Sequence, residues 1–509
     1  MPSMRSSKYP LALALLVGSP LTAGTFTVTT TADFVPGSLR DAINMANSNP
    51  GPDVILFSIP GAGVQTIVPL SALPALTGSG GVFIDGFSQP GAGPGGAPPA
   101  TATLLIEIQG TLAGACDGIV IRSDNNQVQG LIVNQFQHDG IHIEGGGINP
   151  TANFNLVYAC FVGTDPSGTV DLGNGTSTAA LHAGIHVSNV AFGSATHNTI
   201  DGNLVSCNWS EGVWIAGPIQ PGAVNTNFVT DNYVGTDKGG SLDLGNDHQG
   251  VALTEGTTDN EILRNVVSGN DYDGVGLQGF DNVPFAPPIQ TANNLIAENV
   301  VGLDASATIP LPNSMHGITL GTYGPTIWGC TDSNTVRENV IAYNGGDGIA
   351  VVEVSVDTIN ADGNRITRNS TWSNLGLGID LGDDGVTLDD PLDPDSGANQ
   401  QLNSPVLTSA RHTPAKTTIQ GTLQIDISPS LAVVEVFKAQ LDPSGHGEGK
   451  VFLGAVVPAA DGSWTLPTTQ LVPGDRVTAT ATDPSGNTSE FSQVLSVVRG
   501  KVLPKNGTD

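Results

Sequence analysis

The sequence predicts an all-β protein, in which a right-handed parallel β-helix of about nine coils is followed by a small immunoglobulin-like β-sandwich. Three observations support this fold class. Short units punctuated by glycine and asparagine repeat through residues 111–403. Charged residues make up only 13% of a chain that contains 66 glycines, which is typical of turn-rich β structure. After Asn403 the expected strands become longer and alternate regularly between apolar and polar residues.

Two repeated units indicate the coil. In the first, glycine is followed by Ile or Val and alternating apolar residues, as in HDGIHI, SEGVWI and GDGIAV. In the second, asparagines recur every five residues around Ile and Val, as in NEILRNVVSGN. Such short strands cannot bury an apolar face alone, whereas coiling stacks each unit on the next with Ile and Val inside. We expect the asparagines to form ladders along the coil, and the handedness rule for parallel crossovers favours a right-handed β-helix.

The two ends of the coil need covers, because a solenoid exposes unpaired strand edges there. Residues 24–110 are predicted to form an N-terminal cap and the first coils. Ser38 and Asp41 resemble a capping box at the start of a helix whose apolar face we expect to lie across the open end. Residues 404–498 are predicted to form the sandwich, and residues 499–509 a disordered tail.

The first 23 residues have the form of a secretory signal peptide. A basic start is followed by a short apolar run and a small-residue region, and no later segment is apolar for eighteen residues. We therefore expect a bacterial protein that is secreted or displayed at the cell surface, without membrane insertion.

The net charge of −30 argues against nucleic acid as a partner, because such binding needs clustered Lys and Arg. Divalent cations and neutral glycans fit an acidic surface better. The predicted partner is an extracellular polysaccharide or cell-surface glycan.

Four cysteines, Cys116, Cys160, Cys207 and Cys330, show neither a CxxC pair nor a zinc pattern. Both disulfides and buried free thiols are compatible with this spacing.

The segment TVTTTADFVPGSLRDAI resembles the N-terminal cap of secreted bacterial β-helix repeat proteins, which usually reads Cys-Ser-Leu-Arg-Glu-Ala. Here Gly37 replaces the Cys and Asp41 the Glu. The units VGTDPSGTVDLGN and VGTDKGGSLDLGN, and the C-terminal DPSGNTSEFS, are also similar to that group. The resemblance implies export, a β-helix and an appended sandwich. It implies no particular reaction.

Carboxylates before the repeat glycines, together with nearby histidines, are the candidate catalytic groups. Stacked coils place such residues side by side, and paired carboxylates or a histidine base are what glycan cleavage requires. If the protein is an enzyme, the candidates are His138, Asp139, His182, Glu211 and Asp273. The alternative is that these carboxylates only open turns and that the histidines recur through repeat inheritance. No Ser/His/Asp, Gly-rich phosphate-loop or HExxH signature is visible.

A lyase would also need a cation to neutralise a uronate. The coil region offers only six basic residues: Arg122, Lys238, Arg264, Arg337, Arg365 and Arg368. The alternative is that these side chains are solvated or pair with neighbouring acids.

The stretch GIDLGDDGVTLDDPLDPDSG contains seven aspartates in residues 378–397. Calcium prefers six to eight oxygen ligands from carboxylates and loop carbonyls. We therefore predict a structural calcium ion that stiffens the junction between coil and sandwich, with ligands from Asp380, Asp383, Asp384, Asp389, Asp390, Asp393 and Asp395. A solvated acidic linker is the alternative.

Taken together, the residues favour an exported glycan-binding or adhesin-like protein. A polysaccharide lyase or glycoside hydrolase acting along the β-helix is the alternative.

Overall fold

The computed structural model describes residues 23–147, 149–176, 182–190, 192–217, 222–279, 290–321, 331–353, 361–394 and 396–500. The predicted signal peptide lies almost wholly outside these residues, as do most of the predicted tail, Cys330 and Asp395. No helix in the described part of the chain is long and apolar enough to cross a membrane.

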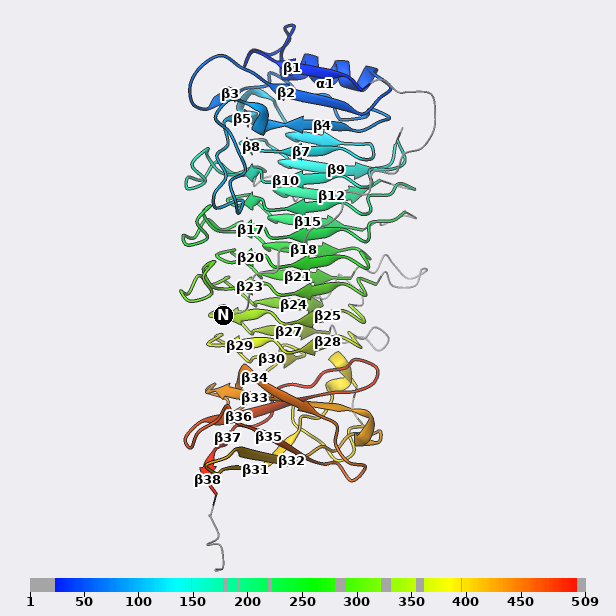
Figure 1. The fold of residues 1–509 in the computed structure, drawn as a ribbon. Helices are drawn as coiled ribbons and strands as arrows, with labels where there is room; N and C mark the ends of the chain where they lie inside the picture. Colours follow the sequence, from blue (N-terminus) through cyan, green and yellow to red (C-terminus); the bar gives the residue numbers. More distant parts are fainter. Residues whose placement is uncertain are drawn as a thin grey trace, which may run out of the picture.

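Most of the described chain forms a right-handed parallel β-helix, as predicted, built from three long parallel sheets (Figure 1). Sheet A contains β1 (Thr25–Val28), β2 (Asp53–Phe57), β4 (Val82–Asp85), β7 (Gln127–Gln129), β10 (Leu156–Tyr158), β13 (Thr199–Asp201), β16 (Phe228–Thr230), β19 (Glu261–Leu263), β22 (Leu295–Ala297), β25 (Thr335–Arg337) and β28 (Arg365–Thr367). Sheet B contains β3 (Gln65–Ile67), β5 (Ile106–Gln109), β8 (Leu131–Asn134), β11 (Phe161–Val162), β14 (Leu204–Val205), β17 (Tyr233–Val234), β20 (Val266–Val267), β23 (Val300–Val301), β26 (Val340–Ala342) and β29 (Ser370–Trp372). Sheet C contains β6 (Ile119–Ile121), β9 (Ile141–Gly145), β12 (Ile185–Asn189), β15 (Val213–Ala216), β18 (Val251–Thr254), β21 (Val275–Gln278), β24 (Ile318–Gly321), β27 (Ile349–Val352) and β30 (Ile379–Leu381).

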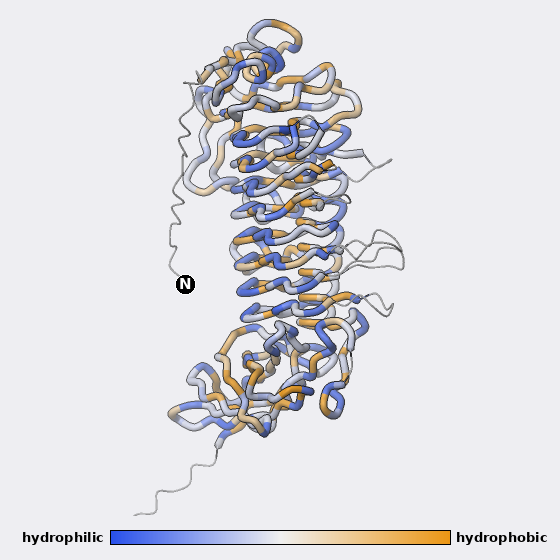
Figure 2. The backbone as a smooth tube through the Cα atoms, turned by 90° about the vertical axis from the view of Figure 1, so that its right-hand side faces the viewer, coloured by the Kyte–Doolittle hydropathy of each residue, from blue (hydrophilic) through white to orange (hydrophobic). Residues whose placement is uncertain are grey.

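Each complete coil contributes one strand to each sheet, so the nine strands of sheet C mark nine coils among the described residues. Within a strand the side chains alternate between the core and the outside. In β9, Ile141 and Ile143 are fully buried, whereas His142 faces outward. Figure 2 shows hydrophilic and hydrophobic stretches alternating along the coils. Stacking in register places Ile141 against Ile185 of the next coil, which builds one continuous apolar core.

Buried asparagine ladders connect the coils at the corners, as predicted. In each step, the backbone N–H and the side-chain amide of one asparagine donate to the Oδ1 of the asparagine one coil further on. Asn227 donates to Asn260 at 2.9 and 3.1 Å, and Asn260 donates to Asn294 at 3.0 and 2.9 Å. Two further ladders repeat this pattern, one through Asn203 and Asn232 and one through Asn208 and Asn246.

The N-terminal end is covered by α1 (Leu39–Ser48), which lies across the first coil (Figure 1). The side chain of Ser38 accepts a hydrogen bond from the backbone N–H of Asp41, which caps the helix as predicted. The apolar face of the helix, including Leu39 and Ile43, is buried in the core of the β-helix.

The C-terminal part contains two four-stranded sheets that enclose a separate apolar core. One sheet contains β31 (Val406–His412), β32 (Thr417–Thr422), β35 (Ser463–Thr468) and β38 (Val498–Arg499). The other contains β33 (Val433–Gln440), β34 (Glu448–Val456), β36 (Arg476–Thr482) and β37 (Leu495–Ser496). Short 3-10 turns complete the described elements: η1 (Gly86–Ser88), η2 (Gly110–Leu112), η3 (Ala398–Gln401) and η4 (Pro429–Leu431).

This sandwich closes the second open end of the β-helix. Phe437 and Phe491 project from the sandwich into the core of the coil. Three glutamates then accept backbone N–H groups at the end of the three parallel sheets. Glu435 accepts from Arg368 after β28 at 2.9 Å, Glu448 accepts from Asn374 after β29 at 3.0 Å, and Glu490 accepts from Leu381 in β30 at 3.0 Å.

The three cysteines in the described residues are free thiols, so the thiol interpretation is confirmed for them. Cys160 and Cys207 are buried, and Cys116 is half-buried. Burial raises the pKa of Cys160 to about 12, which keeps this thiol protonated and unreactive.

Candidate functional site

Sheet C carries most of the candidate groups on its outer face. The strand register aligns one column of outward side chains, and the residue before each repeat glycine forms a second column beside it. The first column is Val120, His142, His186, Trp214, Ala252, Gly276, Thr319, Ala350 and Asp380. The second is Asp117, Asp139, Ala183, Glu211, Gln249, Asp273, His316 and Asp347. We call these two columns and the side chains that touch them the sheet C face.

The repeat glycines hold the second column in place. A Cβ atom on Gly140 would lie 2.7 Å from the carbonyl oxygen of Gly184, and one on Gly184 would lie 2.9 Å from that of Gly212. Neighbouring coils therefore approach too closely at this corner for any other residue. This close approach holds the side chains before the glycines one coil apart, so that Asp117 accepts the backbone N–H of Asp139.

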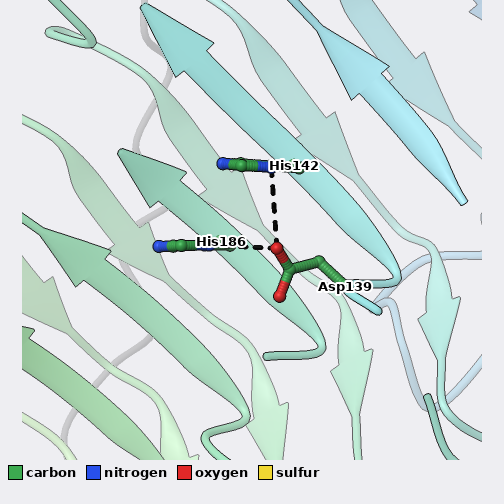
Figure 3. A group of neighbouring side chains, drawn as sticks. All are labelled: Asp139, His142 and His186. Atoms are coloured by element: carbon green, nitrogen blue, oxygen red, sulfur yellow. Dashed lines mark hydrogen bonds and ion pairs between the residues drawn. The ribbon is translucent and has the colours of Figure 1, made fainter. Parts of the chain in front are cut away.

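Asp139 is the centre of the first cluster (Figure 3). It is 3% exposed, and its Oδ2 atom lies 3.0 Å from Nδ1 of His186 and 3.6 Å from Nδ1 of His142. Its Oδ1 atom accepts the backbone N–H of Ala183 at 2.6 Å. Burial alone would raise the pKa of Asp139, but the charge and hydrogen bond of His186, with help from His182, hold it far below its usual range. Asp139 is therefore a buried, ionised partner for histidines.

The histidines of this cluster form stacks. The ring of His142 lies over that of His186 at 4.5 Å, and His186 lies over Trp214 at 4.4 Å. His138 and His182 stack in parallel at 4.3 Å. Register between coils produces these stacks directly, because each ring occupies the same slot as the one before.

A metal ion is one interpretation of this cluster, since Asp139, His142 and His186 each offer a donor atom within 4.8 Å of the others. The rings of His142 and His186 are nearly parallel, however, with 6° between their planes. Their in-plane lone pairs therefore run side by side and do not converge on one ion. The arrangement favours hydrogen-bonded carboxylate–imidazole pairs.

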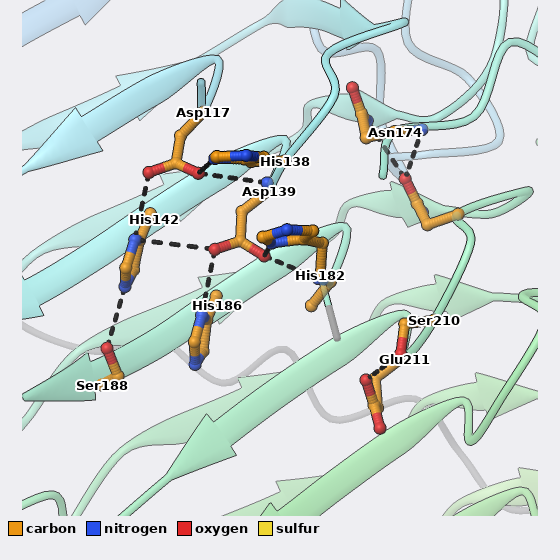
Figure 4. A network of polar contacts seen from close by, with 12 residues as sticks. Asp117, His138, Asp139, His142, Asn174, His182, His186, Ser188, Ser210 and Glu211 are labelled. Atoms are coloured by element: carbon orange, nitrogen blue, oxygen red, sulfur yellow. Dashed lines mark hydrogen bonds and ion pairs between the residues drawn. The ribbon is translucent and has the colours of Figure 1, made fainter. Parts of the chain in front are cut away.

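One of these pairs extends to a hydroxyl group (Figure 4). Nδ1 of His142 lies 3.3 Å from Oδ2 of Asp117, and Nε2 of His142 lies 2.8 Å from Oγ of Ser188. Burial opposes protonation of His142, but its hydrogen bond to Asp117 and the charges of Asp139 and Asp117 together raise its pKa.

A second cluster lies two coils further along. Oε1 of Glu211 lies 2.9 Å from Nδ1 of His248, and Oε2 of Glu211 accepts from the hydroxyl of Ser210 at 2.6 Å. The imidazole of His248 is 35% exposed and stacks on Tyr272 at 4.7 Å. Burial opposes both charges, yet the hydrogen bond and the attraction between the partners raise the pKa of His248 and lower that of Glu211. The pair is therefore a charged dyad with an accessible imidazole.

A third cluster lies near the end of the coil. Nδ1 of His316 lies 3.0 Å from Oδ2 of Asp347, and Nε2 lies 3.7 Å from Oδ1 of Asp383. These three residues form a second group that could hold a metal ion. Asp273 is fully buried and accepts the backbone N–H of His316 at 3.1 Å. Burial is the main cause that raises the pKa of Asp273, and burial with the nearby charge of Asp347 raises that of Asp380 to about 6.

The aspartates predicted to bind calcium fall into two groups among the described residues. Asp380, Asp383 and Asp384 belong to β30 and the turn after it, where Asp380 accepts the backbone N–H of Asp384 at 3.3 Å. Further along, three aspartates hold the loop that enters the sandwich. Asp389 accepts the backbone N–H of Ser404, and Asp393 accepts that of Asn403. The backbone N–H of Asp390 donates to the side chain of Asn403. Asp395 lies outside the described residues. The calcium assignment stays a prediction.

The predicted catalytic residues are thus divided among three clusters of one face. His138, Asp139 and His182 lie together (Figure 4). Glu211 pairs with His248, and Asp273 contacts His316. Sequence reasoning missed Trp214, although its place two residues after the glycine of SEGVWI is the outward slot that also holds His142 and His186.

Four of the arginines considered as uronate partners pair with acids instead. Arg122 bonds to Glu144 and Arg264 to Asp231 at 2.8 Å. Arg337 bonds to Glu338, and Arg368 lies 3.6 Å from the same carboxylate.

No family model matches this chain, so the resemblance to proteins with the Cys-Ser-Leu-Arg-Glu-Ala cap stays a prediction. The A-module of the mannuronan C-5 epimerase AlgE4 of Azotobacter vinelandii is 17% identical, with a TM-score of 0.42, over 67% of this chain and 75% of that one. An alginate lyase from Paenibacillus sp. is 10% identical, with a TM-score of 0.32, over 70% and 99%. The surface adhesin PfbA of Streptococcus pneumoniae is 10% identical, with a TM-score of 0.37, over 70% and 91%.

These likenesses are too distant to transfer an activity. The fold and the side chains themselves define a parallel β-helix protein with a row of carboxylate–imidazole pairs along one sheet.

Proposed function

We propose that this protein is an exported enzyme that cleaves a carbohydrate polymer bound along the sheet C face, with His248 as its proton-transfer group. The single observation that carries this proposal is the Glu211–His248 pair, a buried carboxylate 2.9 Å from an accessible imidazole. A carboxylate on Nδ1 orients the ring and stabilises its protonated form, which leaves Nε2 to exchange a proton with a substrate.

The neighbouring aromatic side chains support a sugar partner. Trp214 lies in the outward column, and its Nε1–H donates to Thr254 at 2.8 Å, which fixes the plane of the indole. Tyr272 stacks on His248 one coil beyond it. Rigid aromatic surfaces of this kind pack against the apolar faces of sugar rings. Small residues follow Trp214 in the same column, at Ala252 and Gly276, so the row of large side chains ends there.

Binding without cleavage is the second candidate, as in an adhesin-like protein. The stacked column of His142, His186 and Trp214 favours it, because stacking alone provides a recognition surface without any proton transfer. The acidic chain and the proposed signal peptide are compatible with both candidates.

We also propose a cation at the junction between coil and sandwich, which the aspartates after β30 support. The sequence argument favours calcium, held by oxygen ligands of the turn that contains Asp383 and Asp384. Its role would be to stiffen the joint, independently of catalysis.

Product release from a panel of plant, algal and bacterial polysaccharides tests the proposal. Wild-type protein should release new chain ends from at least one polymer, H248A should bind that polymer without cleaving it, and W214A should bind it less tightly. H412A, in the sandwich, is the matched control and should behave as wild type. Retained binding with no cleavage by the wild type on any polymer would support the second candidate.

A further inference from the structure

Ser188 is joined to a histidine and a carboxylate in one line of polar contacts (Figure 4). Its Oγ atom lies 2.8 Å from Nε2 of His142, whose Nδ1 lies 3.3 Å from Oδ2 of Asp117. The three residues come from three successive coils: Asp117 precedes β6, His142 belongs to β9 and Ser188 to β12. They are 25 and 46 residues apart, so no local motif marks them.

The alternation of β12 brings Ser188 to the outer face. Ile185 and Val187 are fully buried, whereas His186 and Ser188 point outward beside His142 and Glu144 of β9. A serine two residues beyond the histidine column therefore reaches the Nε2 side of the histidine one coil earlier.

His142 and His186 play different parts, although they occupy equivalent slots. Asp139 is engaged by His186 at 3.0 Å, and Nε2 of His186 is buried without a hydrogen-bond partner. His142 instead has a carboxylate at one nitrogen and a hydroxyl at the other. Only the second arrangement can pass a proton from a hydroxyl to an imidazole that a carboxylate orients.

A hollow of about 550 Å³ lies next to Glu144, the register partner of Ser188. It is lined by Thr77, Arg122, Glu144, Gly146, Gly147, Asn149 and Val190. Glu144 pairs in register with Ser188, and Val190 lies two residues after Ser188 in the sequence. Arg122 and Glu144, which form an ion pair with each other, place one positive and one negative group at the wall of this hollow. The volume suits a small group and not a second polymer chain.

We propose that Ser188 is the nucleophile of a second activity, the hydrolysis of short O-acyl esters carried by the glycan. The inference rests on the proposed function for the identity of the carrier, whereas the ester chemistry stands on the Ser188 cluster alone. Asp117 is a positioning residue in this scheme, because it touches His142 and not the substrate.

The reaction has two balanced halves. Oγ of Ser188 attacks the acyl carbonyl carbon while its proton moves to Nε2 of His142. The bond between that carbon and the sugar oxygen then breaks, and the sugar oxygen takes the proton from His142, which leaves an acylated Ser188. Water attacks the acyl carbon, gives one proton to His142, and releases the carboxylic acid as the bond to Oγ breaks. The proton returns from His142 to Ser188.

Labelling with a fluorophosphonate and turnover of 4-nitrophenyl acetate test the proposal. Peptide mass spectrometry should place the label on Ser188, and S188A should lose both labelling and at least about a thousandfold in turnover. D117N should lower kcat and shift the pH profile of turnover, because it removes the carboxylate that holds the imidazole. S241A, at an exposed serine bonded to Asp237, is the control and should match the wild type.

Two variants separate this inference from the proposed function. H248A should keep ester hydrolysis while it loses polymer cleavage, and S188A should do the reverse. Labelling of another serine, or unchanged ester turnover in a folded S188A, would overturn the inference whatever the polymer assay shows.

Discussion

The Nδ1 atom of His248 lies 2.9 Å from Oε1 of Glu211, a carboxylate that is only 3% exposed. An imidazole held in this way has one fixed nitrogen and one that faces away from the carboxylate. This relationship distinguishes His248 from His186, whose Nε2 is buried. It therefore makes His248 the best-placed proton-transfer group of the sheet C face.

Replacement of His248 by alanine should reduce kcat for polymer cleavage by about 10²–10⁴-fold, the usual contribution of a general acid or base. Because Glu211 raises the pKa of His248 above its ordinary value of 6.5, activity that needs the protonated ring should fall at a higher pH than an unpaired imidazole would allow. E211Q should move that fall to lower pH. The check is kcat/KM measured against pH for the wild type, E211Q and H412A. If the pH dependence of kcat/KM were the same in E211Q as in the wild type, His248 would be excluded as the group that titrates.

The buried Glu448 should make the sandwich–coil joint sensitive to pH. Burial raises the pKa of Glu448, whereas the hydrogen bonds from Asn374 lower it. Burial is the larger effect, so the pKa rises from 4.5 to about 7. The folded state therefore binds this proton more tightly than the unfolded state. Its contribution to stability is complete below about pH 4.5 and is lost as the pH rises through about 7, by up to about 3 kcal/mol.

Chemical denaturation at a series of pH values between about 5 and 8 checks this prediction. The wild type should lose stability across the range, and E448Q should show a flatter curve. S496A, a neutral change at an exposed residue of β37, should follow the wild type. Parallel curves for the wild type and E448Q would show that another group is responsible.

Removal of one rung of an asparagine ladder should destabilise the coil strongly. In N260A, the backbone N–H of Asn227 and one of its two side-chain N–H groups lose their acceptor, while the other side-chain N–H still donates to Ala195. Two buried unsatisfied donors cost about 2–5 kcal/mol, which thermal or urea unfolding can measure. N44A, at an exposed position of α1, is the control and should change stability by less than about 0.5 kcal/mol. A loss in N260A no larger than that of N44A would contradict the ladder's role.

Chelation tests the cation proposed at the junction. If calcium is bound there, EDTA should lower the melting temperature, and added calcium should restore it, because a ligand that binds only the folded state stabilises it. D383N together with D384N should abolish this response. An unchanged melting temperature after chelation would show that no stabilising cation is bound and that these aspartates form only a solvated turn.

The sequence was sufficient to predict the coil, the ladders and the capped helix, because each is a local repeat or a local capping signal. HDGIHI places Ile141 and Ile143 inside and His142 outside from alternation alone. The docking of the sandwich could not be predicted in this way, because Glu448 meets Asn374 across 74 residues and no local pattern joins the two.

The candidate site was predictable in part for the same physical reason. Repeats revealed that the pre-glycine carboxylates share one face, so Asp139 and Glu211 were found. They did not reveal which imidazole each carboxylate bonds, since Asp139 pairs mainly with His186, 47 residues away. The contact between Ser188 and His142 depends likewise on stacking of different coils.

The most direct test of the central claim is the chain length of an end-labelled glycan after incubation with the wild type and with H248A. Catalysis on the sheet C face predicts shorter chains with the wild type and full-length chains with a folded H248A that still binds the polymer. Equal shortening by both proteins would contradict the account. Full-length chains after incubation with a wild type that binds the polymer would contradict it as well.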